Sequence, residues 1–535
     1  MDPKDPSVPA PPVPSEGGVG IAQSVFEAPP SVPPEPSHEP LMMEDTVVVP
    51  PGGGNTSGSG EVTQASQQQN PFIPDIAMPQ VAGSPPANSG NPLMRRILLI
   101  GIPVLVIIVI IAIVRMLLPG SNGSGGSGTG PSKKVTINYW GLWENDAVTR
   151  QFLSDFEAKY PNITVQYTQQ SPKQYRERLQ SAINRGEGPD VFRFHNTWIP
   201  MLRMQLATVP PSVMSVSDFN SAFFPIASSN LVAGTSIFGI PLMIDGLGLY
   251  VNDDLFATAG VTPPTTWTDV ADIVPKLTVK NGTAIVTSAI ALGTATNVEH
   301  FSDILGLLFF QNGADLAALT GKDAEQTLTF YRQFSDPTNP LYTWSDGMDN
   351  SVSAFASGRV AMILAPSWRA HEIAQISPKL RFHIAPVPQL QGNSVAWASY
   401  WVEGVSSKST NQDAAWIFVK YLTSKDGASR LYTEESKTRL FGEPYARVDL
   451  ANTILNDPYT GAYVKQAGFA RSFPIASRTY DNGINDRLIQ YLTDAVNSMA
   501  TGAAPSQVLQ TASAGFRQVL SSYGFVTGSA VTPTP

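Results

Sequence analysis

An uncharged run of eighteen residues, Ile97–Val114 (ILLIGIPVLVIIVIIAIV), constrains this chain more than any other feature. A helix of that length rises about 27 Å at about 1.5 Å per residue, which is close to the hydrocarbon thickness of a bilayer. Pro103 is tolerated there because local adjustments in a membrane helix re-satisfy the carbonyl group that proline frees. Nothing on the N-terminal side offers a core that would bury the run. The sequence therefore predicts a transmembrane helix over residues 95–118.

The charges that flank this run predict its orientation. Arg95 and Arg96 stand directly before it, whereas Arg115 stands alone at its other end and is followed by Gly/Ser sequence. The positive-inside rule places the doubly charged flank in the cytoplasm. The chain has no cysteine, so a lipid-modified cysteine is excluded as a second anchor. We expect a single-pass protein of the cell membrane, with a cytoplasmic N-terminus and an extracytoplasmic domain.

The segments on either side of the predicted span lack the pattern of a folded core. Residues 1–94 are rich in proline, glycine, serine and glutamine (PSVPAPPVP, PGGGNTSGSG) and show no apolar periodicity. Such a composition cannot bury enough apolar surface to offset the loss of chain entropy. We interpret residues 1–94 as a disordered cytoplasmic tail, 119–132 as a flexible Gly/Ser linker, and 133–530 as the extracellular domain.

The net charge of −9 lies entirely in the tail, because ten acidic residues and one lysine precede Arg95. The remaining chain is balanced. A nucleic-acid partner would require a basic patch, so this class of partner is not expected. A balanced extracellular domain is compatible with an uncharged small-molecule ligand.

The first sixty residues of the extracellular domain predict a parallel sheet. Residues 135–139 and 163–167 alternate as strands, and residues 191–194 form a third apolar strand. Between them, apolar positions recur every fourth residue over 147–160 and again from a proposed cap at Ser171-Pro172 to Gly186. A βαβαβ order implies parallel strands with helices on the faces of the sheet. In open sheets of this kind, ligands bind beyond the carboxyl ends of the strands.

Two of these predicted strands end in an indole beside a hydrogen-bonding group. Trp143 and Glu144 follow the first strand, and Asn196 and Trp198 follow the third. Sugars have an apolar ring face and a rim of hydroxyl groups, so an indole beside an amide or carboxylate suits them. We take these four residues as candidate ligand contacts, and His195 as a structural histidine.

Several longer stretches resemble extracellular solute-binding protein family 1, the maltose-binding-like receptors of ABC sugar importers. These stretches are GEGPDVF, FGIPLMIDGLGLYVNDDLF, AGVTPPTTWTDV, AFASGRVAMILAPSW, PVPQLQG and SSKSTNQDAAWIFVKYLTS, in this order. The likeness covers residues 135–425 well and 426–525 loosely. It implies an α/β, two-lobed periplasmic-binding-protein-like fold of type II, with a ligand cleft between the lobes. Lobe one would comprise residues 133–243 and 400–440, and lobe two residues 249–395 and 445–530.

The resemblance also implies further site residues. Asp245 falls at the first crossing between the lobes. Trp368 follows the GRVAMI strand and matches the tryptophan of the family, with Arg369 beside it. The second crossing carries the remaining candidates, which are Trp397, Tyr400, Trp401 and Glu403. Trp368 and Trp401 are the leading choices among all the candidates.

The function implied is capture of a sugar or oligosaccharide by a monomeric domain and its delivery to an ABC permease in the same membrane. No catalytic residues, metal or cofactor are expected, because no GxSxG, HExxH or phosphate-loop motif is present. Two alternatives remain open. A receptor could signal through the proline-rich tail, and a glycosidase could use Glu144 and Glu403 as its paired carboxylates.

Overall fold

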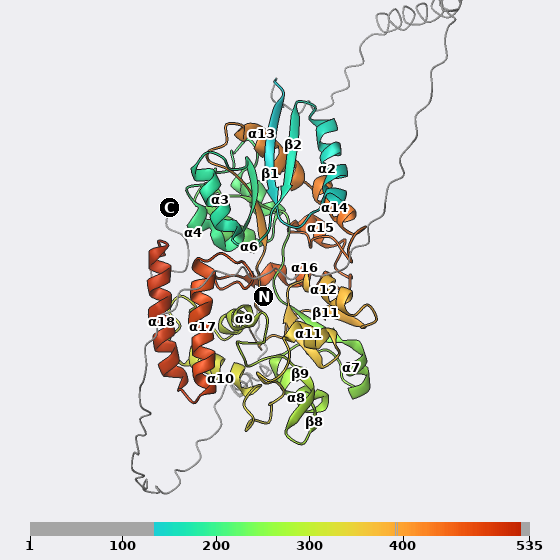
Figure 1. Cartoon of the computed structure of the whole chain (residues 1–535), viewed down its shortest axis with the longest axis vertical. Helices are drawn as coiled ribbons and strands as arrows, with labels where there is room; N and C mark the ends of the chain where they lie inside the picture. Colours follow the sequence, from blue (N-terminus) through green and yellow to red (C-terminus); the bar gives the residue numbers. More distant parts are fainter. Residues whose placement is uncertain (1–132, 391, 393, 526–535) are drawn as a thin grey trace, which may run out of the picture. The chain divides into compact units, whose positions relative to one another are not determined.

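The computed structural model describes residues 133–390, 392 and 394–525, all within one compact unit (Figure 1). The predicted tail, transmembrane helix and linker fall on residues 1–132, outside the described residues. Within the described ranges, no helix combines the length and the apolar character that crossing a bilayer requires.

Five strands form the first sheet, in the order β2-β1-β3-β13-β6. Strand β1 runs parallel to both β2 and β3, as the βαβαβ pattern predicts, whereas β13 is antiparallel to β3 and β6. The alternation of β1 buries Ile137 and Tyr139. The strands are β1 Val135–Gly141, β2 Ile163–Gln169, β3 Val191–His195, β6 Ile240–Pro241 and β13 Trp401–Val405.

The helices beside this sheet follow local capping rules. Helix α2 (Asp146–Lys159) begins after Asn145, whose side chain accepts hydrogen bonds from the backbone N–H groups of Ala147 and Val148. Its buried stripe contacts α14 (Lys425–Glu435), while α13 (Gln412–Leu422) packs on β1 and β13. Helix α3 (Tyr175–Asn184) begins later than predicted. Gln174 adopts a left-handed conformation (φ 56°), so Ser171-Pro172 belongs to a preceding turn.

A second five-stranded sheet has the order β11-β7-β10-β9-β8. Its central strands β7 and β10 are antiparallel and buried along their whole length. Its strands are β7 Gly248–Asn252, β8 Val279–Asn281, β9 Ala284–Ile290, β10 Val360–Ala365 and β11 Phe382–Ala385. The helices between them are α7 Asp253–Ala259, α8 Trp267–Leu277, α9 Phe301–Gln311, α10 Lys322–Gln333, α11 Ser351–Ala356 and α12 Arg369–Ile376.

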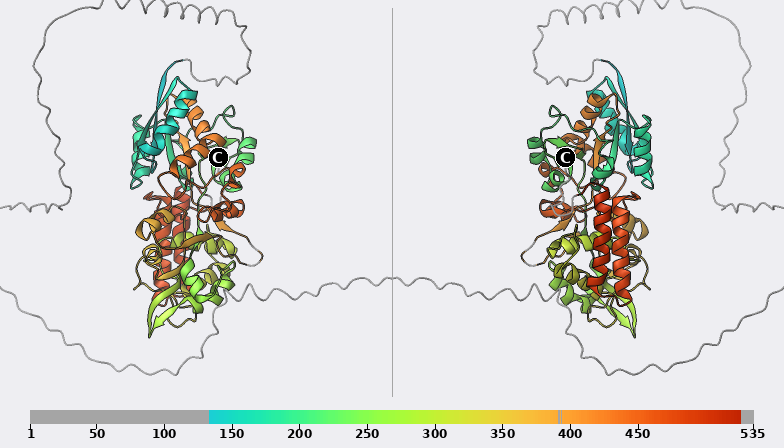
Figure 2. Two further views of the ribbon diagram at one scale, coloured as in Figure 1. Left: turned by 90° about the vertical axis from the view of Figure 1, so that its right-hand side faces the viewer. Right: turned by 90° about the vertical axis from the view of Figure 1, so that its left-hand side faces the viewer.

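Two long helices, α17 (Ile484–Ala500) and α18 (Pro505–Ser522), lie side by side and pack against α10 (Figures 1 and 2). The apolar stripe of α17 is buried, as its recurrence at every fourth position predicts; it consists of Leu488, Leu492 and Val496. The shorter elements are η1 Asn196–Trp198, α4 Ile199–Leu202, α5 Val216–Ala222, α6 Pro225–Leu231, β4 Val232–Ala233, β5 Ser236–Ile237, β12 Ala396–Trp397, α15 Val448–Ala451, α16 Gly461–Gln466, η2 Ala467–Phe469 and β14 Ala470–Arg471.

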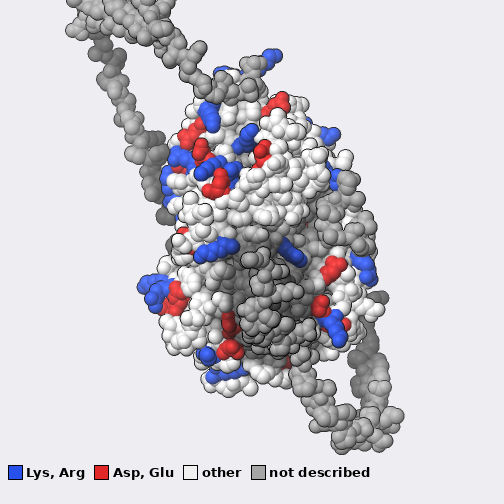
Figure 3. Space-filling model, turned by 180° about the vertical axis from the view of Figure 1, so that it is seen from behind, with Lys and Arg blue, Asp and Glu red and all other residues white. Residues whose placement is uncertain are grey.

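We call each sheet with its helices a lobe. Helix α15 packs against α5 and α14 of the first lobe, and the chain contacts β11 of the second lobe at Pro458, whose carbonyl oxygen accepts from the N–H of Ile384 at 2.8 Å. The return to the second lobe therefore lies after residue 451, later than the predicted residue 445. Acidic and basic side chains are interspersed on the face shown in Figure 3.

The chain segments that cross between the lobes pair with one another. Residues 242–247 connect β6 to β7, and there Gly246 forms a bridge with Ala398, on the segment that leads into β13. A second bridge joins Met243 to Tyr445. These contacts fix the backbone around the crossing.

Gly246→Ala is expected to destabilise the fold, because a Cβ there would lie 1.8 Å from the carbonyl oxygen of Trp397. Relieving such an overlap requires a backbone shift, which costs about 1–3 kcal/mol or more. Gly468→Ala is the matched control, since nothing lies within 4 Å of its Cβ position. Urea unfolding of both variants tests this, and equal midpoints would contradict it.

Candidate functional site

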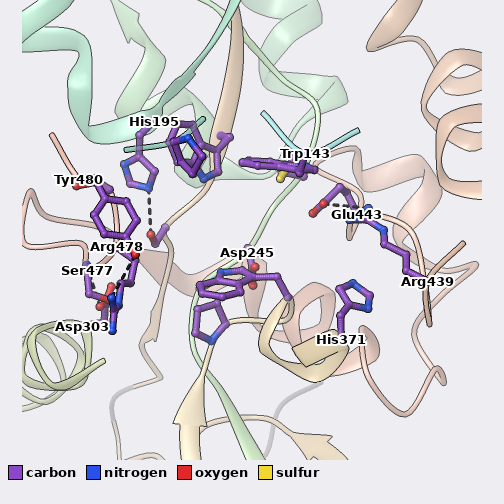
Figure 4. Close-up of a pocket in the computed structure, with 18 residues that line it drawn as sticks. Trp143, His195, Asp245, Asp303, His371, Arg439, Glu443, Ser477, Arg478 and Tyr480 are labelled. Atoms are coloured by element: carbon purple, nitrogen blue, oxygen red, sulfur yellow. Dashed lines mark hydrogen bonds and ion pairs between the residues drawn. The ribbon is translucent and has the colours of Figure 1, made fainter. Parts of the chain in front are cut away.

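A cavity of about 400 Å³ is lined by residues of both lobes. Figure 4 shows the labelled side chains around a common space, with Tyr480, Arg478 and Asp303 toward one end and Arg439, Glu443 and His371 toward the other. The cavity draws on segments far apart in sequence, namely the end of β1, the end of β3, the crossing at Asp245, the turn after β10, the start of β13 and residues 477–480.

Three indoles line the cavity. Trp143 follows β1 and Trp401 opens β13, and their ring centroids lie 5.4 Å apart in an edge-to-face arrangement of 78°. Trp368 follows β10 on the second lobe and is 38 % exposed. The partly exposed ring of Trp368 and the two edge-packed rings give both lobes an apolar surface on the cavity.

Two carboxyl groups on the lining are held by hydrogen bonds. Asp245 accepts from the backbone N–H of Gly246 and from both the N–H and the hydroxyl of Ser367, so it joins the crossing to the second lobe. Burial raises the pKa of Asp245 to about 7. Asp303 accepts from Trp397 Nε1 (2.8 Å) and from the N–H of Ser477 (3.0 Å), and burial raises its pKa to about 6.

The raised pKa of Asp245 predicts a pH-dependent stability. The folded-state pKa of about 7 exceeds the reference value of 3.8, so the folded chain binds this proton more tightly than the unfolded chain does. The contribution of this proton to the free energy of unfolding is fully present below about pH 4 and is lost as the pH rises through about 7. Asp245→Asn mimics the protonated group. We expect its free energy of unfolding, relative to that of the wild type, to be on the order of 2 kcal/mol higher at pH 8 than at pH 5.

Thermal unfolding between pH 5 and pH 8 measures this difference. Asp272→Asn, at an exposed position of α8, is the control and should follow the wild-type profile. Parallel profiles for Asp245→Asn and wild type would show that the carboxyl group is already charged in the folded protein at pH 5.

Several buried polar atoms on the lining have no hydrogen-bond partner among the described residues. They are Trp143 Nε1, His371 Nδ1, Thr479 Oγ1 and Arg439 Nε. Buried donors and acceptors are almost always paired in folded proteins, so these atoms leave polar groups of the wall unsatisfied in this conformation. His195, by contrast, contacts Thr197 Oγ1 at 2.8 Å and Ser399 Oγ at 3.1 Å, and burial lowers its pKa to about 3.

The arginines on the lining are already ion-paired. Arg439 pairs with Glu435 and Glu443 at 2.7 and 3.0 Å, and Arg478 pairs with Glu299. An anionic ligand would have to displace these partners, so the wall fits a neutral ligand with hydroxyl groups better.

Of the ten residues predicted from the sequence, the structure brings four to this cavity: Trp143, Asp245, Trp368 and Trp401. Glu144 and Glu403 do not line it, because both are buried in ion pairs with Arg193 (2.5 and 2.7 Å). The remaining four lie elsewhere.

Trp198 and Trp397 are buried in the core behind the wall. Asn196 lines a separate cavity of about 80 Å³, where it donates to Asn230 at 3.0 Å. Tyr400 is fully buried, and its hydroxyl also donates to Asn230 (2.9 Å). These four side chains support the cavity from behind or beside it. Arg369, named beside Trp368, is buried and does not line the cavity either.

The sequence did not reveal residues 477–480 as part of the wall. Arg478 and Tyr480 adopt left-handed backbone conformations (φ 61° and 51°), and Asn482 follows at 44°. Such conformations are unfavourable for arginine and tyrosine, whereas asparagine tolerates them, and backbone strain of this kind concentrates at functional sites. The segment spans both lobes, since Ser477 contacts Asp303 of α9 and Arg176 of α3 donates to the carbonyl of Asp481 at 2.6 Å. Locally, TYDNG reads only as a turn.

Comparison with known proteins agrees with this geometry. The family model of the bacterial extracellular solute-binding proteins matches residues 141–429. The chain is 23 % identical over 312 residues to the multiple sugar-binding protein of Streptococcus mutans, covering 56 % of this chain and 73 % of that protein. It is 22 % identical over 293 residues to a putative binding protein of Brucella abortus, covering 52 % and 69 %.

Solved structures show the same fold. The sugar-binding protein of the phytopathogen Xanthomonas citri has a TM-score of 0.61 at 20 % identity, covering 72 % of this chain and 98 % of that chain. A cyclo/maltodextrin-binding protein complexed with maltotetraose has a TM-score of 0.58 at 18 % identity, covering 73 % and 98 %. All four of these proteins are described as binding proteins.

Proposed function

The chain belongs to the bacterial extracellular solute-binding proteins, and from this premise we propose that its inter-lobe cavity captures a sugar or a short oligosaccharide for an ABC importer. The observation that carries the proposal is the composition of the wall. Indoles from both lobes line a cavity of about 400 Å³ together with hydroxyl-bearing residues such as Ser399 and Thr479. Stacking on an indole and hydrogen bonding at the rim are the two interactions that a pyranose requires.

The mechanism is closure on the ligand. A ligand that touches both lobes favours the conformation in which both walls reach it, by the difference between its affinities for the two conformations. Asp245 lies where this rotation is centred, because it joins the crossing segment to Ser367 of the second lobe. The closed domain is then presented to the permease.

The rest of the chain serves this role as a tether. In this proposal residues 95–118 anchor the protein in the cell membrane, residues 1–94 lie in the cytoplasm, and the 119–132 linker holds the binding domain outside. Tethering raises the effective concentration of the domain near a permease in the same membrane. The two-lobed domain, residues 133–530, acts as a monomer.

The geometry of the cavity also bears on the two alternative functions, a glycosidase and a signalling receptor. A glycosidase would need Glu144 and Glu403 on either side of a sugar, but both are buried against Arg193 and neither lines the cavity. We therefore propose a protein without enzymatic activity, cofactor or metal. Signalling through the proline-rich tail is the second candidate, and a cytosolic protein that binds the tail only when the ligand is present would favour it.

A thermal-shift screen of the full chain against neutral mono- and oligosaccharides tests the proposal. A ligand that binds only the folded state raises the melting temperature as its concentration rises. We expect a neutral sugar to give a saturable shift that Trp368→Ala largely removes. A shift produced by amino acids or peptides, with none from any sugar, would contradict the proposed ligand class.

A further inference from the structure

Two of the three indoles on the cavity, one from each lobe, lie against a buried arginine. The Cζ atom of Arg193 is 4.7 Å from the ring centroid of Trp143, and that of Arg369 is 4.0 Å from the ring of Trp368. Both indoles line the cavity and neither arginine does. Each guanidinium therefore contacts an indole of the cavity without lining the ligand space itself.

In the first lobe, hydrogen bonds from the edge of its guanidinium group hold Arg193 in place. Arg193 Nη1 donates to Glu144 Oε1 at 2.5 Å, Nε donates to Glu403 Oε1 at 2.7 Å, and Nη2 donates to the hydroxyl of Tyr139 at 3.1 Å. Glu403 stands directly opposite Arg193 in the β3–β13 register, so the sheet itself sets this pair. With its donors used along the edge, the planar group keeps a face free for the indole.

The arginine of the second lobe is held in the same manner by different residues. Arg369 pairs with Glu299 and with Glu372, one turn along α12, and its Nε donates to His300 Nε2 at 3.1 Å. The two sites come from unrelated segments, yet both combine a buried guanidinium, two carboxylates and an indole on the cavity. This repetition points to a shared role.

We propose that Arg193 and Arg369 are positioning residues that hold Trp143 and Trp368 in the orientation in which each ring stacks on the sugar. A cation over the face of an indole is attracted by the ring quadrupole. The ring is then ordered before the ligand arrives, and the ligand does not bear the entropy loss of ordering it. This inference rests on the proposed function, since it takes the cavity as the ligand site.

Replacement by lysine separates positioning from charge. Lysine keeps a positive charge near the carboxylates but lacks the planar fork that pairs along its edge and stacks on its face. Arg447→Lys is the matched control. Arg447 lies over the ring of Phe223 (5.6 Å) and pairs with Asp449, but neither it nor this ring lines the cavity.

The first measurement needs no ligand. The full chain carries nine tryptophans, which can be labelled with 5-fluorotryptophan, and Trp143→Phe and Trp368→Phe assign two of the fluorine resonances. We expect Arg193→Lys to shift and broaden the Trp143 resonance while leaving that of Trp368 in place. Arg369→Lys should do the reverse, and Arg447→Lys should change neither. Unchanged resonances in both lysine variants would overturn the inference.

The second measurement is a calorimetric double-mutant cycle with maltotriose as the probe. Arg193→Lys should weaken binding about threefold to tenfold in the wild-type chain and should have no further effect in the Trp143→Ala chain. Additive losses would mean that Arg193 does not act through Trp143, which overturns the inference.

The same cycle keeps the two proposals distinguishable. If Trp143→Ala leaves maltotriose affinity unchanged, or if maltotriose does not bind, the result counts against the proposed site or against this sugar. The positioning role is then decided by the fluorine resonances alone.

Discussion

Trp368→Ala is expected to weaken sugar binding by roughly ten- to a hundredfold while leaving thermal unfolding almost unchanged. The indole is 38 % exposed on the cavity, so its truncation removes a stacking surface without emptying a core. Burying an aromatic side chain against a ligand contributes on the order of 1.5–3 kcal/mol, which corresponds to this change in affinity. Calorimetric titration and thermal melts of the same preparation measure both quantities.

Trp344→Ala is the control with the opposite signature. Trp344 is fully buried in the second lobe, where its Nε1 donates to Asn297 at 2.9 Å. Truncation of such a core indole costs about 3–5 kcal/mol of folding stability. A Trp368→Ala protein with a collapsed melting temperature and an unchanged affinity would return this residue to the core and remove it from the site.

Arg193→Met is expected to lower the free energy of unfolding strongly. Methionine fills a similar volume but leaves Glu144 and Glu403 without their buried cation. Breaking a buried ion pair by removing one partner costs about 3–5 kcal/mol. Burial already raises the pKa of Glu403, and Arg193 is the chief group that lowers it. The variant should therefore take up protons more readily, and its stability deficit should shrink as the pH falls toward 5.

Arg381→Met is the comparison for this prediction. Arg381 pairs with Asp254 on the surface, where both side chains are largely exposed. Exposed pairs of this kind contribute little, so we expect no measurable change in urea unfolding. Equal stability of the two variants at neutral pH would show that water, and not Arg193, satisfies the two carboxylates.

Much of the fold could be predicted from the sequence, because apolar periodicity and the order of strands and helices can be read along the chain. The βαβαβ pattern of the first lobe and the stripe in α17 are confirmed, as is the family. The predicted start of α3 was wrong, because Gln174 adopts a left-handed conformation and the turn before the helix is longer than predicted. The predicted membrane span remains a prediction from composition, since it lies outside the described residues.

The site was harder to predict because it depends on contacts between distant segments. The position of Glu144 after a strand predicts a ligand contact, but the sequence also contains evidence against this prediction. Arg193 stands in the middle of an apolar strand, and a buried arginine requires carboxylate partners. Residues 477–481 offered no comparable signal, since their position depends on the contacts of Ser477 with α9 and of Asp481 with α3.

Hydrogen–deuterium exchange of the full chain, with and without a sugar that shifts its melting temperature, tests the central claim most directly. Binding between the lobes should slow exchange in three separate segments, around Trp143 in the first lobe, around Trp368 in the second, and at residues 477–480. Protection in one lobe alone, or protection only outside these segments, would contradict a ligand site built from both walls.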